Sequence, residues 1–95
     1  MSKQFEKMAI PLRCRVQTSG RLVDVRLLAL DLRHVVFSCD SELPFRLPIT
    51  FRIGGLRLCA RVRWAIRGGY GAQFEGLDLA SLRALYRVIK SQSGG

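Results

Sequence analysis

Arginine is the residue type in this chain whose chemistry is most distinctive. The 95-residue sequence has 16 Lys and Arg against 7 Asp and Glu, a net charge of +9 at pH 7, and most of the basic residues are arginine. The arginine side chain presents a planar fork of N–H donors that binds phosphate or a guanine edge through two parallel hydrogen bonds. The composition therefore predicts an anionic partner: a nucleotide, a nucleic acid, an acidic protein or an anionic lipid.

Residues suited to catalysis or metal binding do not form a recognisable set. His34 is the only histidine, and no paired carboxylates or nucleophile–base arrangement accompany it. Cys14, Cys39 and Cys59 lack the paired spacing of a zinc site, so we expect them to be ordinary small apolar residues. We therefore expect no catalytic residue, no metal site and no cofactor, and a protein that is not an enzyme.

Length and hydropathy predict one small domain. Hydrophobic residues make up 48% of the chain and charged residues 24%, which is close to a globular average. The longest uncharged run, Gly68 to Phe74, is far shorter than the roughly 20 apolar residues of a membrane helix. Met1 to Lys7 lacks the apolar stretch of a secretory signal. We expect a cytoplasmic protein without membrane insertion.

The elements that must carry the arginines are mostly strands. Apolar and polar residues alternate with period two, which predicts strands over residues 12–17, 21–30, 34–39, 49–53, 56–65 and 70–74. The clearest of them places Leu58, Ala60, Val62 and Trp64 on one face, and Gly54-Gly55 before it predicts a tight hairpin. The same parity assigns the aromatic side chains to the core.

The period changes near the C-terminus, where the spacing predicts a helix. Its apolar stripe contains Leu79, Leu82, Leu85, Tyr86 and Ile89, and Asp78 stands at the N-cap position. Six short strands in hairpin order, followed by a helix, predict an antiparallel six-stranded β-barrel with a C-terminal α-helix. The expected organisation is a flexible N-terminal arm at 1–10, the barrel at 11–77, the helix at 78–91 and a loose tail at 92–95.

The second half of this pattern resembles a PilZ domain. Arg61-Val62-Arg63-Trp64 takes the place of that family's "GRVVR" strand, and Tyr70-Gly71-Ala72-Gln73-Phe74 takes the place of "YGIGVxF". The resemblance covers nearly the whole chain, from about Lys3 to Ile89, and its specificity lies in the order and spacing of short motifs. It implies a bacterial six-stranded barrel of a family that typically binds cyclic di-GMP through RxxxR and D/NxSxxG motifs.

Both ligand motifs are altered in this chain. Lys3 and Lys7 form KxxxK where the family has RxxxR, and Asp31, Arg33 and Val36 occupy the acid, serine and glycine positions of the second motif. Lysine lacks the arginine fork, and each lost bidentate pair costs about 1–3 kcal/mol. Losing two pairs would cost about 2–6 kcal/mol if the terms add, enough to turn micromolar binding into millimolar binding.

Other arginines offer two further candidate surfaces. Arg13 and Arg15 are expected to lie near Arg33, where they would substitute for the missing guanidinium groups. A second set alternates outward on adjacent strands and is expected to form one basic interaction face, consisting of Arg52, Arg57, Arg61 and Arg63. Its alternative interpretation is a solvated exterior whose arginine stems cover apolar neighbours.

The resemblance implies a regulatory binding module in motility, pilus or exopolysaccharide control. Because both motifs are altered, we expect weak or absent cyclic di-GMP binding and action through a protein partner. One alternative is a functional cyclic di-GMP receptor that uses substituted residues. The other is a small basic nucleic-acid-binding β-barrel, which is disfavoured because its aromatic residues are assigned to the buried face.

Overall fold

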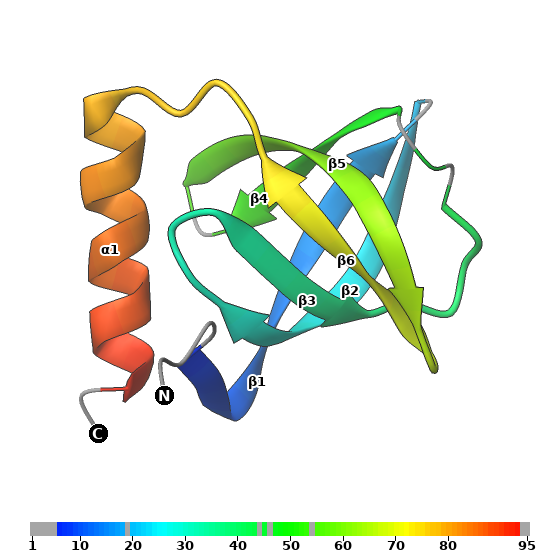
Figure 1. Ribbon diagram of the computed structural model, residues 1–95, viewed down its shortest axis with the longest axis horizontal. Coiled ribbons are helices and arrows are strands. Elements are labelled where there is room, and N and C mark those ends of the chain that lie inside the picture. The colour runs from blue at the N-terminus through cyan, green and yellow to red at the C-terminus, as the bar shows by residue number, and fades with distance from the viewer. Residues whose placement is uncertain (1–5, 19, 44, 46, 54, 94–95) are drawn as a thin grey trace.

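The fold was analysed in a computed structural model, which describes residues 6–18, 20–43, 45, 47–53 and 55–93. Its elements follow one another along the chain as six strands and then one helix (Figure 1). They are β1 (Glu6–Thr18), β2 (Arg21–Leu30), β3 (His34–Ser38), β4 (Pro48–Ile53), β5 (Leu56–Ile66), β6 (Gly69–Phe74) and α1 (Leu79–Ser93).

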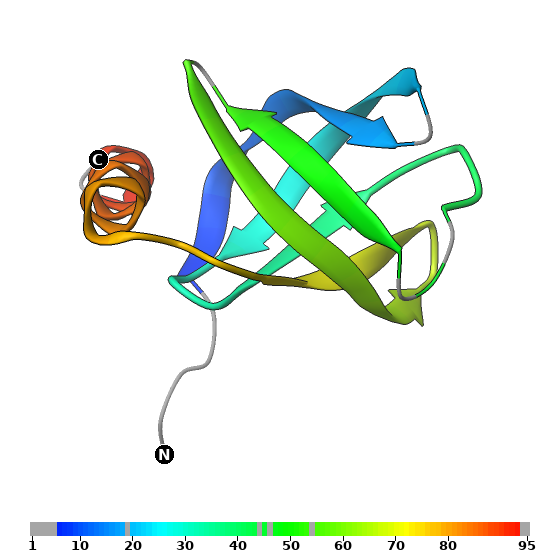
Figure 2. The same cartoon turned by 90° about the horizontal axis from the view of Figure 1, so that it is seen from above.

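The six strands close into an antiparallel barrel in the order β1-β2-β3-β6-β5-β4. Pairing of β1 with β4 completes the circle through Arg15 with Arg52, Val16 with Phe51 and Gln17 with Thr50. Seen from above, α1 lies outside the barrel with its axis almost along the line of view (Figure 2). The predicted six-stranded barrel with a C-terminal helix is therefore confirmed.

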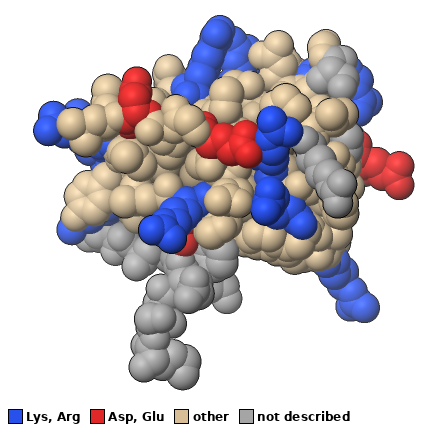
Figure 3. Space-filling view, turned by 45° about the horizontal axis from the view of Figure 1, so that its top comes forward, with Lys and Arg blue, Asp and Glu red and all other residues tan. Residues whose placement is uncertain are grey.

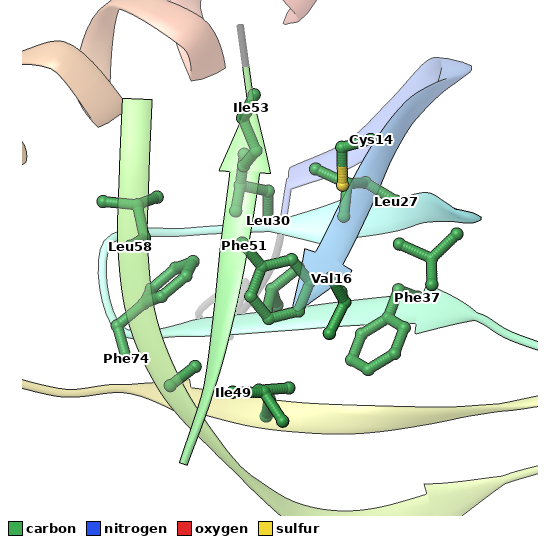
Figure 4. Packing of buried hydrophobic residues seen from close by; sticks show 14 of the residues in the cluster. Cys14, Val16, Leu27, Leu30, Phe37, Ile49, Phe51, Ile53, Leu58 and Phe74 are labelled. Atoms are coloured by element: carbon green, nitrogen blue, oxygen red, sulfur yellow. The ribbon is translucent and has the colours of Figure 1, made fainter. Parts of the chain in front are cut away.

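Inward-facing side chains fill the barrel, as the period-two pattern predicts. Phe37 and Phe51 pack edge to face at 5.1 Å between ring centroids, and both are fully buried. Figure 4 shows the apolar side chains of the strands converging in the barrel interior. Leu85 and Ile89 of α1 belong to the same cluster, so the helix closes the core on its side of the barrel.

The first strand begins earlier than the sequence predicts. β1 starts at Glu6, so residues 6–10 of the predicted flexible arm are strand, while residues 1–5 lie outside the described part of the chain. Its register with β2 shifts between Lys7 and Leu12, and Pro11, which has no N–H for the ladder, lies in that stretch. A strand is predicted from the alternation of apolar and polar residues. A shift in register interrupts that alternation, so the sequence did not predict this part of β1.

A β-bulge turns Trp64 to the outside of the barrel. Val62 pairs with Ala72 and Trp64 pairs with Gly71, so Arg63 is the extra residue on β5. One inserted residue reverses the alternation beyond it. The prediction that Trp64 shares the inner face of Leu58, Ala60 and Val62 is therefore wrong. Its indole covers Gly71, where a Cβ atom would collide with the ring.

Helix α1 begins as the capping signal predicts, but its stripe is narrower. Asp78 Oδ1 accepts a hydrogen bond from the Ser81 amide at 2.8 Å, and the helix extends from Leu79 to Ser93 instead of over the predicted 78–91. Tyr86 is 51% exposed and Leu79 64% exposed, so both are wrongly assigned to the buried stripe. No helix in the described part of the chain is long and apolar enough to cross a membrane.

Candidate functional site

The strand register brings the two altered PilZ-like motifs to the same end of the barrel. Glu6 pairs with Leu30 and Lys7 pairs with Ala29, so the end of the first motif lies beside the residues that precede Asp31. Lys3 lies outside the described residues, and only the backbone of Lys7 is placed. The candidate nucleotide site is thus built around the turn between β2 and β3.

The carboxylate of Asp31 is engaged in the turn that carries it. Its Oδ1 accepts hydrogen bonds from the backbone amides of Arg33 and His34, both at 2.7 Å. The Asp31 amide in turn donates to the His34 carbonyl at 3.0 Å, and the Phe74 amide donates to the Arg33 carbonyl at 2.8 Å. This arrangement is an Asx turn, which engages one of the two oxygens of the carboxylate.

The serine and glycine positions of the second motif present different surfaces. Arg33 is exposed to solvent at the turn. Val36 is half-buried on β3 and pairs with Gly71, which in turn pairs with Trp64. A valine side chain therefore stands where the family motif has no Cβ, in the same cross-strand row as the Trp64 indole.

Arg13 and Arg15 do not substitute for the missing guanidinium groups. Arg13 pairs with Arg26, and Arg26 pairs with Ser38, so Arg13 belongs to the row at the far end of β3 from Arg33. The five residues of β3 alone span about 15 Å. The expectation that Arg13 and Arg15 lie close to Arg33 is therefore wrong, because both belong to a different part of the barrel wall.

The predicted basic face splits into two parts. Arg52 and Arg57 are a direct cross-strand pair between β4 and β5. Arg61 instead donates from Nε to Glu75 Oε1 at 2.7 Å, and exposed Arg63 occupies the bulge. Lys and Arg side chains are spread over the face shown in Figure 3, with Asp and Glu side chains between some of them. The four arginines thus form no single stripe.

Trp64 is the surface residue that reasoning from the sequence missed. It is half-buried on the outer wall, and its ring centroid lies 5.8 Å from that of His34 on β3. The residues of β5 around Arg63 do not by themselves predict the bulge. The glycine at position 71 is the only hint, because a residue without a Cβ accommodates a large neighbour on an adjacent strand.

The three cysteines are unpaired and differ in environment. Burial raises the pKa of the Cys14 thiol to about 12, so it stays neutral. Burial also raises the pKa of Cys39, whose Sγ lies 3.3 Å from the Ser41 carbonyl oxygen. Cys59 is exposed on the outer face of β5. Among the described residues, no group of three or more His, Cys, Asp or Glu side chains could hold a metal ion.

Comparison with models of known protein families and with curated proteins found no match. The similarity to PilZ domains therefore rests on the motif residues quoted above and on the order of the strands.

Proposed function

We propose that this protein is a PilZ-type regulatory binding module that acts through a protein partner and not through catalysis. In this proposal it binds cyclic di-GMP weakly or not at all. The closed barrel with its C-terminal helix has the architecture that the resemblance implies. A cytoplasmic location and a role in motility, pilus or exopolysaccharide control follow from the resemblance and are part of the same proposal.

The observation that carries the proposal is the state of the turn after β2. Asp31 Oδ1 already accepts two backbone hydrogen bonds, and Val36 fills the glycine position. A ligand that needs both carboxylate oxygens would have to compete with the turn for Oδ1, and it would meet a side chain on the wall. Both features oppose tight binding of a guanine base, independently of the lysines that replace the arginines of the first motif.

The outer wall around Trp64 is the surface that we favour for the protein partner. Tryptophan is over-represented among the residues that contribute most to protein–protein binding. The Trp64 indole lies over Gly71 and beside His34, with exposed Arg63 next to it on β5. An aromatic side chain with basic neighbours suits a partner that offers an apolar residue flanked by acidic ones.

The test is restoration of the family motifs. A variant combining Lys3→Arg, Lys7→Arg, Arg33→Ser and Val36→Gly is titrated calorimetrically with cyclic di-GMP beside the wild-type protein. We expect saturable micromolar binding to the variant and at least about 30-fold weaker binding to the wild type, as the loss of two bidentate pairs predicts. The triple variant that keeps Val36 controls for loss of folding. Micromolar binding to the wild-type protein would contradict the proposal.

Outward-facing Trp64 also favours a second candidate, a nucleic-acid-binding barrel. Bases stack on exposed aromatic side chains, and this stacking contributes about 1–3 kcal/mol per base. The net charge of +9 would attract the phosphate backbone. A salt-dependent gel shift with single-stranded RNA that Trp64→Ala abolishes would support this candidate, and no shift at low salt would exclude it.

A further inference from the structure

Three arginines form one continuous row across three strands on the outer wall. Arg15 on β1 pairs with Arg52 on β4, and Arg52 pairs with Arg57 on β5. Residues paired in this way have Cβ atoms about 5 Å apart, and like charges placed directly opposite each other are destabilising. The fold therefore places three arginine residues side by side on adjacent strands at a cost in stability, which a bound anion would remove.

Negative charge near this row is sparse. Asp24 lies 3.4 Å from Arg15 Nε, and its side chain is 90% exposed. Arg52 and Arg57 have no acidic partner within 4.0 Å among the residues that the structure describes. Three positive groups with one solvated counter-charge leave a local excess that corresponds to the charge of a phosphate dianion.

The arginine row lines a surface hollow of about 500 Å³, which lies within the usual size range of small-ligand sites. Cys14, Gly55 and Leu56 complete its lining. Nothing lies within 4 Å of the position that a Cβ would take at Gly55, so the backbone is open on that side. The buried Cys14 thiol, with its pKa raised to about 12, adds no negative charge.

Three other hollows contain arginine, and two of these also contain acids. One, of about 520 Å³, is lined by Arg13 and Arg26 together with Asp24 and Asp40. A second, of about 660 Å³, contains Arg63 and the ion pair of Arg61 with Glu75. The third, of about 250 Å³, has Arg83 and Arg87 of α1 in its described lining without an acid, beside apolar side chains. Of the four hollows, the one at the arginine row is the one in which three arginines from different strands meet without an acid among the described lining residues.

We propose that the hollow between Arg15, Arg52 and Arg57 is a binding site for a small phosphorylated ligand, held by its phosphate group. A planar carboxylate accepts one guanidinium fork well, whereas the oxygens of a tetrahedral phosphate can meet forks that arrive from several strands. The described residues that line the hollow include no aromatic side chain, so the proposed site recognises the phosphate and not a stacked base.

A small ligand fits this site better than a nucleic-acid strand does. A strand would need aromatic platforms beside the charges. Trp64 is well removed from Arg57, because the intervening part of β5 spans about 20 Å. The site also lies far along β1 from Lys7, so it does not depend on the proposal about cyclic di-GMP and is tested without that nucleotide.

The test is titration of the isotope-labelled full chain with pyrophosphate, followed by amide chemical shifts. Three double variants are compared with the wild type: Arg52→Gln with Arg57→Gln, Arg52→Lys with Arg57→Lys, and Arg21→Gln with Arg67→Gln as a charge-matched control at exposed positions. We expect saturable shifts around residues 15, 52 and 57. Affinity should fall about tenfold or more in the first variant, about three- to tenfold in the lysine variant, and less than about threefold in the control.

The remaining outcomes either contradict the proposed site or show which part of the ligand it recognises. Equal loss in the glutamine and control variants would mean only general attraction to a basic protein, and shifts that do not saturate would have the same meaning. Adenosine diphosphate binding as tightly as pyrophosphate would support recognition through phosphate alone. A single-stranded oligonucleotide that binds far more tightly than pyrophosphate, and loses that binding in the glutamine variant, would overturn the assignment to a small ligand.

Discussion

The Asp31 carboxylate stabilises the turn between β2 and β3, and this role engages one of its two oxygens. Oδ1 accepts from the amides of Arg33 and His34 at 2.7 Å each, and the side chain is only 26% exposed. An acceptor with two short backbone bonds is replaced by a ligand only if the ligand compensates both amides. Asp31, which stands at the acid position of the family motif, therefore stabilises the turn in this protein.

Removing the Asp31 carboxylate should therefore destabilise the protein. Asp31→Ala leaves two turn amides without their acceptor, and we expect a loss of about 1–2 kcal/mol in the free energy of unfolding. Asp31→Asn keeps an oxygen acceptor and should stay within about 0.5 kcal/mol of the wild type. Urea unfolding measures both. Equal stability of Asp31→Ala and the wild type would contradict the structural role of this carboxylate.

Gly71 is the position at which the outer wall is most sensitive to added volume. A Cβ there would collide with the Trp64 indole, so Gly71→Ala must displace the ring. We expect a loss of about 1–3 kcal/mol in unfolding free energy and a red shift of fluorescence from the single tryptophan.

The matched control for Gly71→Ala is Gly55→Ala, where nothing lies within 4 Å of the added Cβ. Thermal unfolding and emission spectra of the two variants are compared. An unchanged spectrum in Gly71→Ala would mean that Trp64 does not cover this glycine.

Among the elements, α1 depends on its N-terminal cap for a defined start. Asp78 Oδ1 accepts from the Ser81 amide at 2.8 Å, and the hydrogen bonds from Ser81 lower the pKa of the Asp78 carboxyl below 3.8. A carboxyl whose pKa is lower in the folded state than in the unfolded chain stabilises the fold at pH values above its unfolded pKa. This stabilisation is lost as the pH falls through the pKa that the carboxyl has in the folded protein.

Replacing the cap should therefore have an effect that depends on pH. Asp78→Ala should unfold at a lower urea concentration than the wild type at about pH 7, and the difference should shrink at about pH 3. Circular dichroism of the helix measures the midpoints. Asp78→Ser, which keeps a capping oxygen without a charge, should show a difference from the wild type that varies less with pH. A difference for Asp78→Ala that does not change with pH would contradict the role of the charged cap.

Strand periodicity predicted most of the elements and missed the places where pairing becomes irregular. The strands from Ile49 to Phe74 have nearly the predicted bounds, because their alternation reflects a wall with one buried face. The bulge at Arg63 and the shift before Leu12 depend on the partner strand, so no local pattern reveals them. Trp64 was placed on the wrong face for this reason.

For the molecule as a whole, barrel closure decides which arginines act together. The sequence predicted one face of Arg52, Arg57, Arg61 and Arg63. The closed barrel keeps Arg52 beside Arg57, and the pairing of β1 with β4 adds Arg15 to them. Glu75, which neutralises Arg61, comes from the segment after β6. The residue types of the candidate surfaces were thus predictable, but their grouping required the order of the strands around the barrel.

The central proposal is that this protein does not bind cyclic di-GMP tightly at the turn between β2 and β3. Titration of the isotope-labelled wild-type protein with cyclic di-GMP tests it most directly, because amide shifts report where a ligand binds. We predict no saturating shifts at residues 31–36 at micromolar nucleotide, and no change at His34 or Val36 that follows a binding curve. Saturating shifts centred on that turn, with a micromolar dissociation constant, would contradict the account.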